Sequence, residues 1–495
     1  MRLRAKLTHF VVALWSDTDG IILPYVSIML IAIVGISVLA LDAARYMSLQ
    51  TQLQNGADAL ALAGAAELDR LPDAEARALN AINTLVSNSS LFGSGSAKTV
   101  KAANVQFYNR LPARDDYPLS AGQLAADATQ ARFIPVTARP VTLSTILPAA
   151  FFGGANRITT GAAAVAGFDQ VVCDAAPIFV CNPYEATGMT YAQASGALQA
   201  AAADKSLRRR LIRLRQYGRG SDPYQAGDYG FLDAAALTSS SPALINALAS
   251  ARPGACFTQN AVLLRPGFEP SAREGLNVRF DMYQGAMAGA RTSSTYRPSL
   301  NVRKGYVGGG SSSSGNMCNA VPANAWPIGT PPNQATGLPL DRSWPYMNGS
   351  MGQGNWDFDT YWQVNHGPAG RDVPVIDGEQ VSSTNPPSRY AVYRYEIEHG
   401  YVADRSPGGE TGAPACYAGG DLSDLPDRRV LQVAVLNCQN LGLAGAVPVA
   451  VPAAAFAKFF LTLPLARSQT DLYVELAGLV KPHDPGNFET VQLYR

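Results

Sequence analysis

Residues 20–41, GIILPYVSIMLIAIVGISVLAL, form the longest uncharged apolar stretch of this sequence. At about 1.5 Å of rise per residue, a helix of this length spans roughly 33 Å, enough to cross a hydrocarbon core about 30 Å thick. Arg2, Arg4 and Lys6 precede the stretch, whereas Arg45 is the only basic residue in the twenty positions after it. This distribution predicts a single membrane helix with a cytoplasmic N-terminus and the bulk of the chain outside.

A cleaved signal peptide is the alternative interpretation, because Val38, Leu39 and Ala40 loosely fit a small-residue cleavage site. The apolar stretch is longer than a usual signal-peptide core, and residues 41–68 continue it with no Pro and only two Gly. The sequence therefore predicts that the anchor runs on into an amphipathic helix with an Ala-rich stripe, which a sheet or another helix can approach closely. The stripe recurs at intervals of three or four: Leu49, Leu53, Ala57, Leu60, Gly64 and Leu68.

Several features of this segment together resemble a known family. A Gly stands before the apolar stretch, a Pro lies early in it, DAARY follows at its exit, and LQNGADALALAGA continues the helix. The motif positions are Gly20, Pro24, Asp42, Arg45, Tyr46, Gln54 and Asp58. The pattern is similar to the N-terminal domain of TadG-like proteins of the Flp, or tight-adherence, pilus assembly system. The resemblance implies a bacterial inner-membrane protein of pilus assembly, with other Tad proteins or minor pilins and membrane lipid as partners and no nucleic acid.

The sequence departs from the family pattern in two respects. Pilins of this class are processed after a Gly and usually keep a Glu at the fifth mature position, where Tyr25 stands here. We therefore predict that the prepilin peptidase does not cleave this chain. Some TadG-like proteins carry a von Willebrand A-type domain, whose Asp-x-Ser-x-Ser loop binds a divalent cation, and this pentapeptide does not occur in the sequence. We therefore expect no domain of that type.

Composition and pattern predict an α+β protein. The 495 residues are 47% hydrophobic, with 45 Gly and 33 Pro, which indicates a folded, loop-rich chain. A net charge of +1 gives no long-range attraction to nucleic acid. We divide the chain into a basic cytoplasmic segment (1–20), a membrane helix (21–41), a pilin-like domain with a long helix on a small antiparallel sheet (42–168), and a disulfide-bearing periplasmic α+β domain (169–495).

The expected elements follow from apolar periodicity and from Gly, Pro and Asn boundaries. In the pilin-like domain we expect a helix at 72–88, a turn at 93–98, strands at 100–108, 130–141 and 158–168, and a short helix or crossover at 143–152. In the second domain we expect helices at 190–203, 207–217 and 233–250, a flexible Gly/Ser/Pro-rich loop at 305–345, and strands at 389–398, 428–438, 456–465, 472–479 and 490–494.

Six cysteines lie in the second domain: Cys173, Cys181, Cys256, Cys318, Cys416 and Cys438. An even number outside the membrane fits disulfides in an oxidising compartment. The sequence does not decide among the fifteen pairings, and our preferred hypothesis joins sequence neighbours: 173 with 181, 256 with 318, and 416 with 438. Zinc binding is the alternative, but no CxxC occurs and the four His are dispersed.

The search for chemistry is mostly negative. HExxH, GxSxG and GxxxxGK do not occur, so we expect no enzyme and no cofactor. Residues 355–359, NWDFD, resemble the start of a calcium loop, but Thr360 replaces the turn Gly and His366 replaces the final Glu. His366 and His399 are candidate bases, although an isolated His is more often structural. Two further function classes stay open: an anchored periplasmic hydrolase without a linear motif, and an adhesin or binding module.

Residues 207–217, LRRRLIRLRQY, are expected to form a helix with five arginines around a leucine stripe. These arginines could bind lipid phosphates or an acidic partner. The plainer interpretation is a solvated helix with its leucines in the core.

Overall fold

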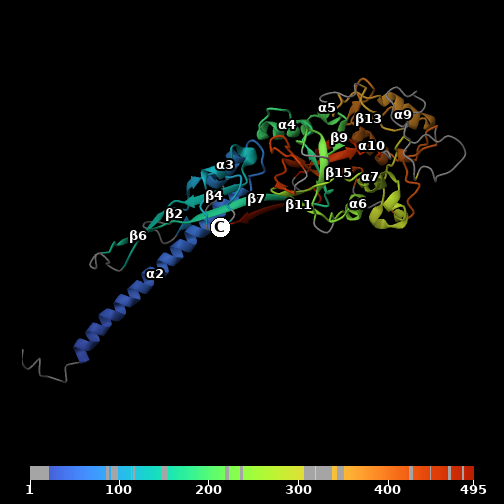
Figure 1. Ribbon diagram of the computed structural model, residues 1–495. Helices are drawn as coiled ribbons and strands as arrows, with labels where there is room; N and C mark the ends of the chain where they lie inside the picture. The colour runs from blue at the N-terminus through green and yellow to red at the C-terminus, as the bar shows by residue number, and fades with distance from the viewer. Residues whose placement is uncertain are drawn as a thin grey trace, which may run out of the picture. The chain divides into compact units, whose positions relative to one another are not determined.

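The structure is a computed structural model, and it divides into two compact units, residues 1–168 with 491–495 and residues 169–490 (Figure 1). It describes residues 22–84, 89–90, 98–112, 114, 117–146, 154–217, 222–234, 238–305, 318, 337–342, 350–407, 409–422, 427–445, 448–465, 470–481 and 484–494.

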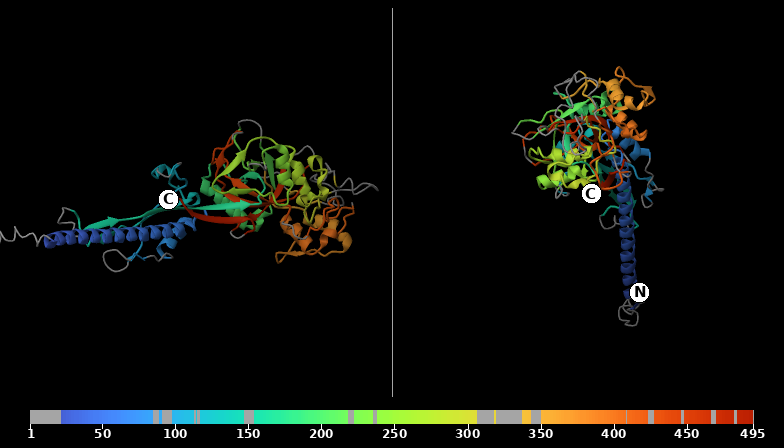
Figure 2. Two further views of the ribbon diagram at one scale, coloured as in Figure 1. Left: turned by 90° about the horizontal axis from the view of Figure 1, so that it is seen from below. Right: turned by 90° about the vertical axis from the view of Figure 1, so that its right-hand side faces the viewer.

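The first unit is built on one long helix, α2 (Ile22–Ala65). Its N-terminal half is long and apolar enough to cross a membrane, and its side chains there are exposed, as in Ile31 at 73%. Figures 1 and 2 show this half projecting beyond the sheet of the unit. The C-terminal half buries Leu49, Leu53, Ala57 and Leu60 against the unit's core. The expected apolar helix that continues as an amphipathic helix is confirmed.

A small antiparallel sheet covers the amphipathic half of α2. The strands β3 (Ala102–Val105), β4 (Phe133–Ala138) and β7 (Ala163–Cys173) pair in that order, and Ile134 and Val136 of β4 point into the core shared with the helix. The last strand, β19 (Asn487–Leu493), pairs with β7. Among the described residues, the other elements of the unit are α3 (Ala74–Thr84), η2 (Ala121–Gln123), η3 (Ala128–Gln130), and the hairpins β1 (Ser89–Ser90) with β2 (Lys98–Thr99) and β5 (Val141–Ser144) with β6 (Arg157–Thr160).

The second unit contains an eight-stranded sheet that closes on itself. Because β9 pairs with both β18 and β10, six strands form a closed ring in the order β10, β8, β15, β17, β18 and β9. The pairs β8–β15 and β9–β10 are parallel and the others antiparallel. The strands are β8 (Ile178–Cys181), β9 (Ile212–Gln216), β10 (Asp228–Leu232), β12 (Val262–Arg265), β15 (Val430–Leu436), β16 (Ala450–Val451), β17 (Ala455–Leu461) and β18 (Leu472–Leu479).

Both faces of this sheet are buried. Alternate residues of β15 enter different clusters, Leu431 and Val433 on one side and Ala434 and Leu436 on the other. This explains the nearly continuous apolar run of that strand. Helices α4 (Tyr191–Ala203), α6 (Ser241–Ala249) and α7 (Ala272–Asn277) contribute side chains to the first cluster. Shorter elements are α5 (Lys205–Arg208), β11 (Cys256–Thr258), η6 (Val278–Phe280), η7 (Gly285–Met287), η8 (Ala290–Thr292) and η9 (Ser294–Tyr296).

A helical layer with its own aromatic core packs on β17. Helices α9 (Phe358–His366) and α10 (Arg389–Glu398) bury Trp356, Trp362 and Tyr393 together with Phe460 of the strand. Asp357 and Ser388 cap these two helices by accepting backbone N–H groups of Thr360 and Ala391. The hairpin β13 (Val375–Ile376) with β14 (Glu379–Gln380), η11 (Gly367–Ala369) and η12 (Tyr401–Ala403) complete the layer.

The α+β fold class is confirmed, but several local predictions are wrong. Residues 389–398 form the helix α10 instead of a strand, and 207–217 contain the end of α5 and the strand β9 instead of one helix. The helix expected at 233–250 is limited to α6. The predicted turn at 93–98 lies outside the described residues, apart from Lys98 in β2. The part of the expected crossover at 143–152 that follows Ile146, and most of the expected loop at 305–345, also lie outside them.

The expected disulfide pairing is also wrong. The structure joins Cys173 to Cys256, Cys181 to Cys438, and Cys318 to Cys416, which are 83, 257 and 98 residues apart in sequence. Sequence neighbours do not pair because the sheet brings distant strands together: Cys173 lies opposite Cys256 in the β7–β11 ladder, and Cys181 lies opposite Leu436 in the β8–β15 ladder.

Candidate functional site

The candidate site of the first unit is the part of α2 where the apolar stretch ends. Asp42 is only 5% exposed, and both of its carboxylate oxygens accept the backbone N–H of Ile146, at 3.0 and 2.9 Å. Arg45 donates from Nη1 to Asp42 Oδ1 at 3.2 Å and to the carbonyl of Ser144 at 3.3 Å. These two motif residues therefore hold the end of the β5–β6 hairpin against the helix.

Gln54 makes an equivalent contact two to three turns further along α2. Its Nε2 donates to the carbonyl of Ala163, the first residue of β7, at 3.1 Å and to Asp58 Oδ1 at 2.7 Å. Asp58 thereby fixes the orientation of the Gln54 amide. Since Asp42, Arg45 and Gln54 all bind backbone groups, they position strands on the helix whatever side chains those strands carry.

Small residues let the sheet approach α2 closely. A Cβ atom added at Gly56 would lie 2.8 Å from Cγ1 of Val100, and one added at Gly64 would lie 2.8 Å from the Cδ1 atoms of Ile134 and Ile82. Tyr46, another motif residue, packs partly buried against the same core. Pro24 lies in the first turn of α2, where a missing N–H costs no hydrogen bond, and Gly20 lies outside the described residues.

Comparison with known families bears on this segment directly. Residues 20–67 match the Tad family model, whose description is putative Flp pilus-assembly TadE/G-like. Residues 20–67 are therefore similar to a Tad domain. The match covers the whole of α2. It therefore includes Asp42, Arg45 and Gln54, the helix residues whose contacts with the strands are described above. This similarity supports a role associated with Flp pilus assembly, and the length and composition of α2 make it a candidate membrane anchor. No curated protein and no solved structure matches the chain.

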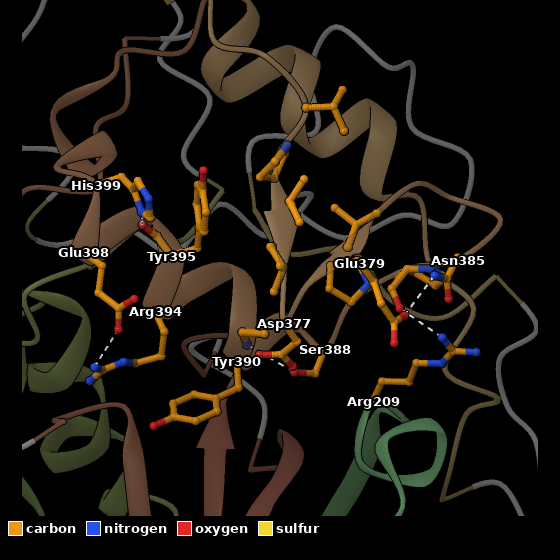
Figure 3. A pocket seen from close by; sticks show the side chains of 18 of the residues that line it. Arg209, Asp377, Glu379, Asn385, Ser388, Tyr390, Arg394, Tyr395, Glu398 and His399 are labelled. Carbon is orange, nitrogen blue, oxygen red and sulfur yellow. Dashed lines mark hydrogen bonds and ion pairs between the residues drawn. The ribbon is translucent and has the colours of Figure 1, made fainter.

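The second unit has a groove of about 1240 Å³ beside α10 (Figure 3). The exposed face of α10 forms one wall, and residues 370–381 with the β13–β14 hairpin form another. Figure 3 shows Glu398 and His399 at one end and Arg209 at the other. The ring of His399 stacks on Tyr395 at 3.8 Å, and Arg394 pairs with Glu398 at 2.8 Å. Aromatic rings that lie beside paired charged side chains are common in surfaces that bind ligands.

The two candidate bases have different environments. His399 is exposed and its Nδ1 lies 3.0 Å from the carbonyl of Tyr395. His366 is fully buried, with Nε2 2.9 Å from Glu396 Oε1 and Nδ1 2.9 Å from Asp404 Oδ2. Burial alone would raise the pKa of Glu396, but the hydrogen bond from His366 and the charge of Arg303 outweigh it and lower that pKa.

A second buried charge cluster lies at the start of α10. Arg389 donates to Asp341 and Glu475, each at 2.7 Å, and all three side chains are fully buried. One guanidinium thus faces two carboxyl groups. Burial raises the pKa of Glu475 to about 7, although the charge of Arg389 and its hydrogen bond act in the opposite direction.

The other sequence candidates are occupied by local interactions. Asp357 caps α9 and accepts from the Ser383 hydroxyl at 2.9 Å, and Asp359 accepts from the Ser383 N–H at 3.0 Å. Among the five arginines, Arg215 pairs with Asp228 at 3.2 Å and Arg209 donates to the carbonyl of Pro386 at 3.0 Å. In the described part of the chain, no group of three or more His, Cys, Asp or Glu side chains could hold a metal ion.

Sequence reasoning missed most partners of these clusters. Arg303, Glu396 and Asp404 converge on His366 and its neighbour Asn365 from positions up to about one hundred residues apart. One signal was present: Arg389, Val392, Tyr393 and Glu396 are spaced as one face of a helix, and all four are buried. Because the first and last residues of this pattern are charged, it does not form the apolar stripe by which a buried helix face is usually predicted.

Proposed function

We propose that this chain is a membrane-anchored component of Flp pilus assembly that acts through protein contacts and not through catalysis. The observation that carries the proposal is the division of α2 at Asp42. Residues matched by the Tad model form an exposed apolar half before that position and a half docked on a sheet after it. The same helix thus supplies a membrane anchor and the base of a folded unit.

The disulfides and the basic residues support an orientation. Arg2, Arg4 and Lys6 precede the span, which favours a cytoplasmic N-terminus. All six cysteines follow it and all are paired, which favours an oxidising compartment for the second unit. We therefore assign the bulk of the chain to the periplasm of a bacterial cell and the anchor to the inner membrane. Tyr25, in place of the processing-associated Glu, supports an N-terminus that the prepilin peptidase does not process.

The partner surface in this proposal is the exposed stripe of α2 beyond the membrane. Met47, Thr51 and Asn55 are exposed at intervals of four, and Met47 is 69% exposed. Other Tad assembly proteins or minor pilins, which carry similar helices, are the expected partners. Helices with small side chains near such a stripe can associate closely.

Photo-crosslinking in intact membranes tests this function. A photoreactive amino acid at Met47 or Thr51 should capture Tad pilus assembly proteins, identified by mass spectrometry, whereas the same group at the exposed Gln363 of α9 should not. Recovery of no pilus protein from either stalk position would contradict the proposal. Protease protection of sealed membrane vesicles tests the orientation separately.

The groove favours a second function, that of a binding module on the second unit. The aromatic residues Tyr390, Tyr395 and Tyr401 line it together with charged side chains. Replacing Tyr395 with Ala should abolish any ligand contact there without reducing crosslinking from Met47, because the two sites belong to different units.

A further inference from the structure

The β5–β6 hairpin follows α2 toward the end of the apolar span. Three contacts define this path: the hydroxyl of Thr160 lies 3.5 Å from Gln50 Oε1, the carbonyl of Ser144 accepts from Arg45, and the N–H of Ile146 donates to Asp42. The partner on the helix moves from position 50 to 45 to 42. The hairpin therefore reaches the first charged residue after the apolar stretch.

The depth of this contact follows from the helix rise. The polar headgroup layer is roughly 5–8 Å thick on each side of the hydrocarbon core. Asp42 and Arg45 are three residues apart, which is about 4.5 Å along a helix. When residues 21–41 occupy the core, Asp42 and Arg45 lie in the headgroup layer, and so do Ser144 and Ile146, which are hydrogen-bonded to them.

The described end of the hairpin carries the side chains expected at such a depth. Ile146 is 55% exposed and Ile158, paired opposite the buried Leu143, is 39% exposed. Arg157 is exposed beside them, opposite Ser144. Leu41, at the end of the span, is also exposed, at 56%.

We propose that the end of the β5–β6 hairpin is a second membrane contact of this chain, with the lipid surface as its partner. Ile146 and Ile158 enter the interface next to α2, and Arg157 meets the lipid phosphates. Asp42 and Arg45 act as positioning residues, because they hold the hairpin at this depth through its backbone. A helix held at two points in the interface has its rotation fixed relative to the bilayer, which a single span does not achieve.

The test measures the depth of a spin label on the full chain in vesicles of phosphatidylethanolamine and phosphatidylglycerol. A bioorthogonal ketone amino acid carries the label, so the native disulfides stay intact. Labels at Ile146 and Ile158 are compared with one at Leu39 inside the span and one at Asn55, thirteen residues beyond Asp42 on α2. Collision with oxygen, which concentrates in lipid, and with a water-soluble nickel complex gives the depth of each label.

We expect the labels at Ile146 and Ile158 to show oxygen accessibility above, and nickel accessibility below, that of Asn55, by at least twofold each. In Asp42→Ala the label at Ile158 should shift toward the values of Asn55, because the hairpin loses its attachment to the helix. Values at both isoleucines equal to those of Asn55 in the unaltered chain would overturn the proposal. A water-exposed label at Leu39 would instead show that α2 does not span the bilayer, which distinguishes failure of the anchor from failure of the hairpin contact.

Discussion

Cys181 and Cys438 are joined by a disulfide that spans 257 residues of sequence, and both side chains are fully buried. The bond ties β8 to the end of β15 on the face of the sheet that includes Phe179 and Leu436. Beside it, Asn182 donates to Asn437 Oδ1 at 2.9 Å, so the polar residue next to each cysteine is also paired. The bond therefore ties together the parallel β8–β15 pair, whose two strands are far apart in sequence.

Removal of this bond should destabilise the chain strongly. A native disulfide typically contributes about 2–5 kcal/mol. The double variant Cys181→Ala, Cys438→Ala also removes two fully buried sulfur atoms from a packed core. The double variant Cys173→Ala, Cys256→Ala removes a bond in which Cys256 is exposed, so it loses less packing. We expect the first double variant to have the lower free energy of unfolding, measured with guanidinium in detergent. The reverse order would contradict the packing argument, and peptide mapping that recovered the 173–181 pair would contradict the topology.

Valine at Gly56 or Gly64 should loosen the sheet from α2. The added side chain would collide with Val100 in the first case and with Ile134 and Ile82 in the second. Overpacking of this kind costs about 1–3 kcal/mol. Hydrogen exchange of the β4 amides (Phe133–Ala138) should become faster. Gly35→Val is the matched control on the same helix, because no heavy atom lies within 4 Å of its added Cβ. Equal exchange in all three variants would show that close approach is not what holds the sheet.

The strongly periodic N-terminal segment was predictable because one physical requirement dominates it. An uncharged run long enough for a bilayer, followed by apolar residues every three or four positions, fits only a helix that changes its environment at Asp42. The exact match of the strand expected at 472–479 with β18 has a similar cause, since the sequence LYVELAGL contains strand-forming residues and is bounded by polar residues typical of turns.

The segments that were predicted wrongly have patterns that fit two structures. In LRRRLIRLRQ, Leu207, Leu211 and Leu214 fit a helical stripe, but Ile212 and Leu214 also alternate with Arg213 and Arg215. Pairing of Leu214 with Leu472 and of Ile212 with Val474 selects the strand. In RYAVYRYEIE the buried face of the helix begins at Arg389 and ends at Glu396, and both residues are charged. The sequence therefore shows no apolar helical stripe, and the burial of these two residues is explained only by their distant partners. The disulfide pairing depended in the same way on the order of strands in the sheet.

The two candidate histidines should differ sharply in their effect on stability. His366→Leu leaves the buried carboxylates of Glu396 and Asp404 without the group that bridges them, and loss of one partner in a buried charge cluster costs about 3–5 kcal/mol. His399→Leu removes an exposed ring and should cost less than about 1 kcal/mol. Fluorescence-detected unfolding reports on this region, because the ring of Trp362 lies 4.3 Å from that of His366. Similar stabilities of the two variants would refute the structural role of His366.

Glu475 should make the second unit less stable as the pH rises from about 4.5 to about 7. Its folded-state pKa is raised to about 7 from an ordinary value of 4.5, so between these pH values the folded state holds a proton that the unfolded state has released. Its stabilising contribution is complete below pH 4.5 and is lost as the pH passes 7. At 1.36 kcal/mol per pKa unit, the loss is about 3 kcal/mol. The physical cause is burial, which disfavours the ionised carboxylate more than the charge and hydrogen bonds of Arg389 favour it. One proton on Glu475 leaves Arg389 and Asp341 as a neutral pair.

Glu475→Gln tests this contribution because an amide cannot lose the proton. The free energy of unfolding of the variant should depend less steeply on pH between 4.5 and 7 than that of the unaltered chain, as measured by guanidinium titrations at several pH values. Glu398→Gln is the control, since Glu398 is 53% exposed in its pair with Arg394 and should leave the slope unchanged. A slope that is equally steep in Glu475→Gln would mean that Glu475 is ionised in the folded chain, with Arg389 neutralising only part of the buried charge.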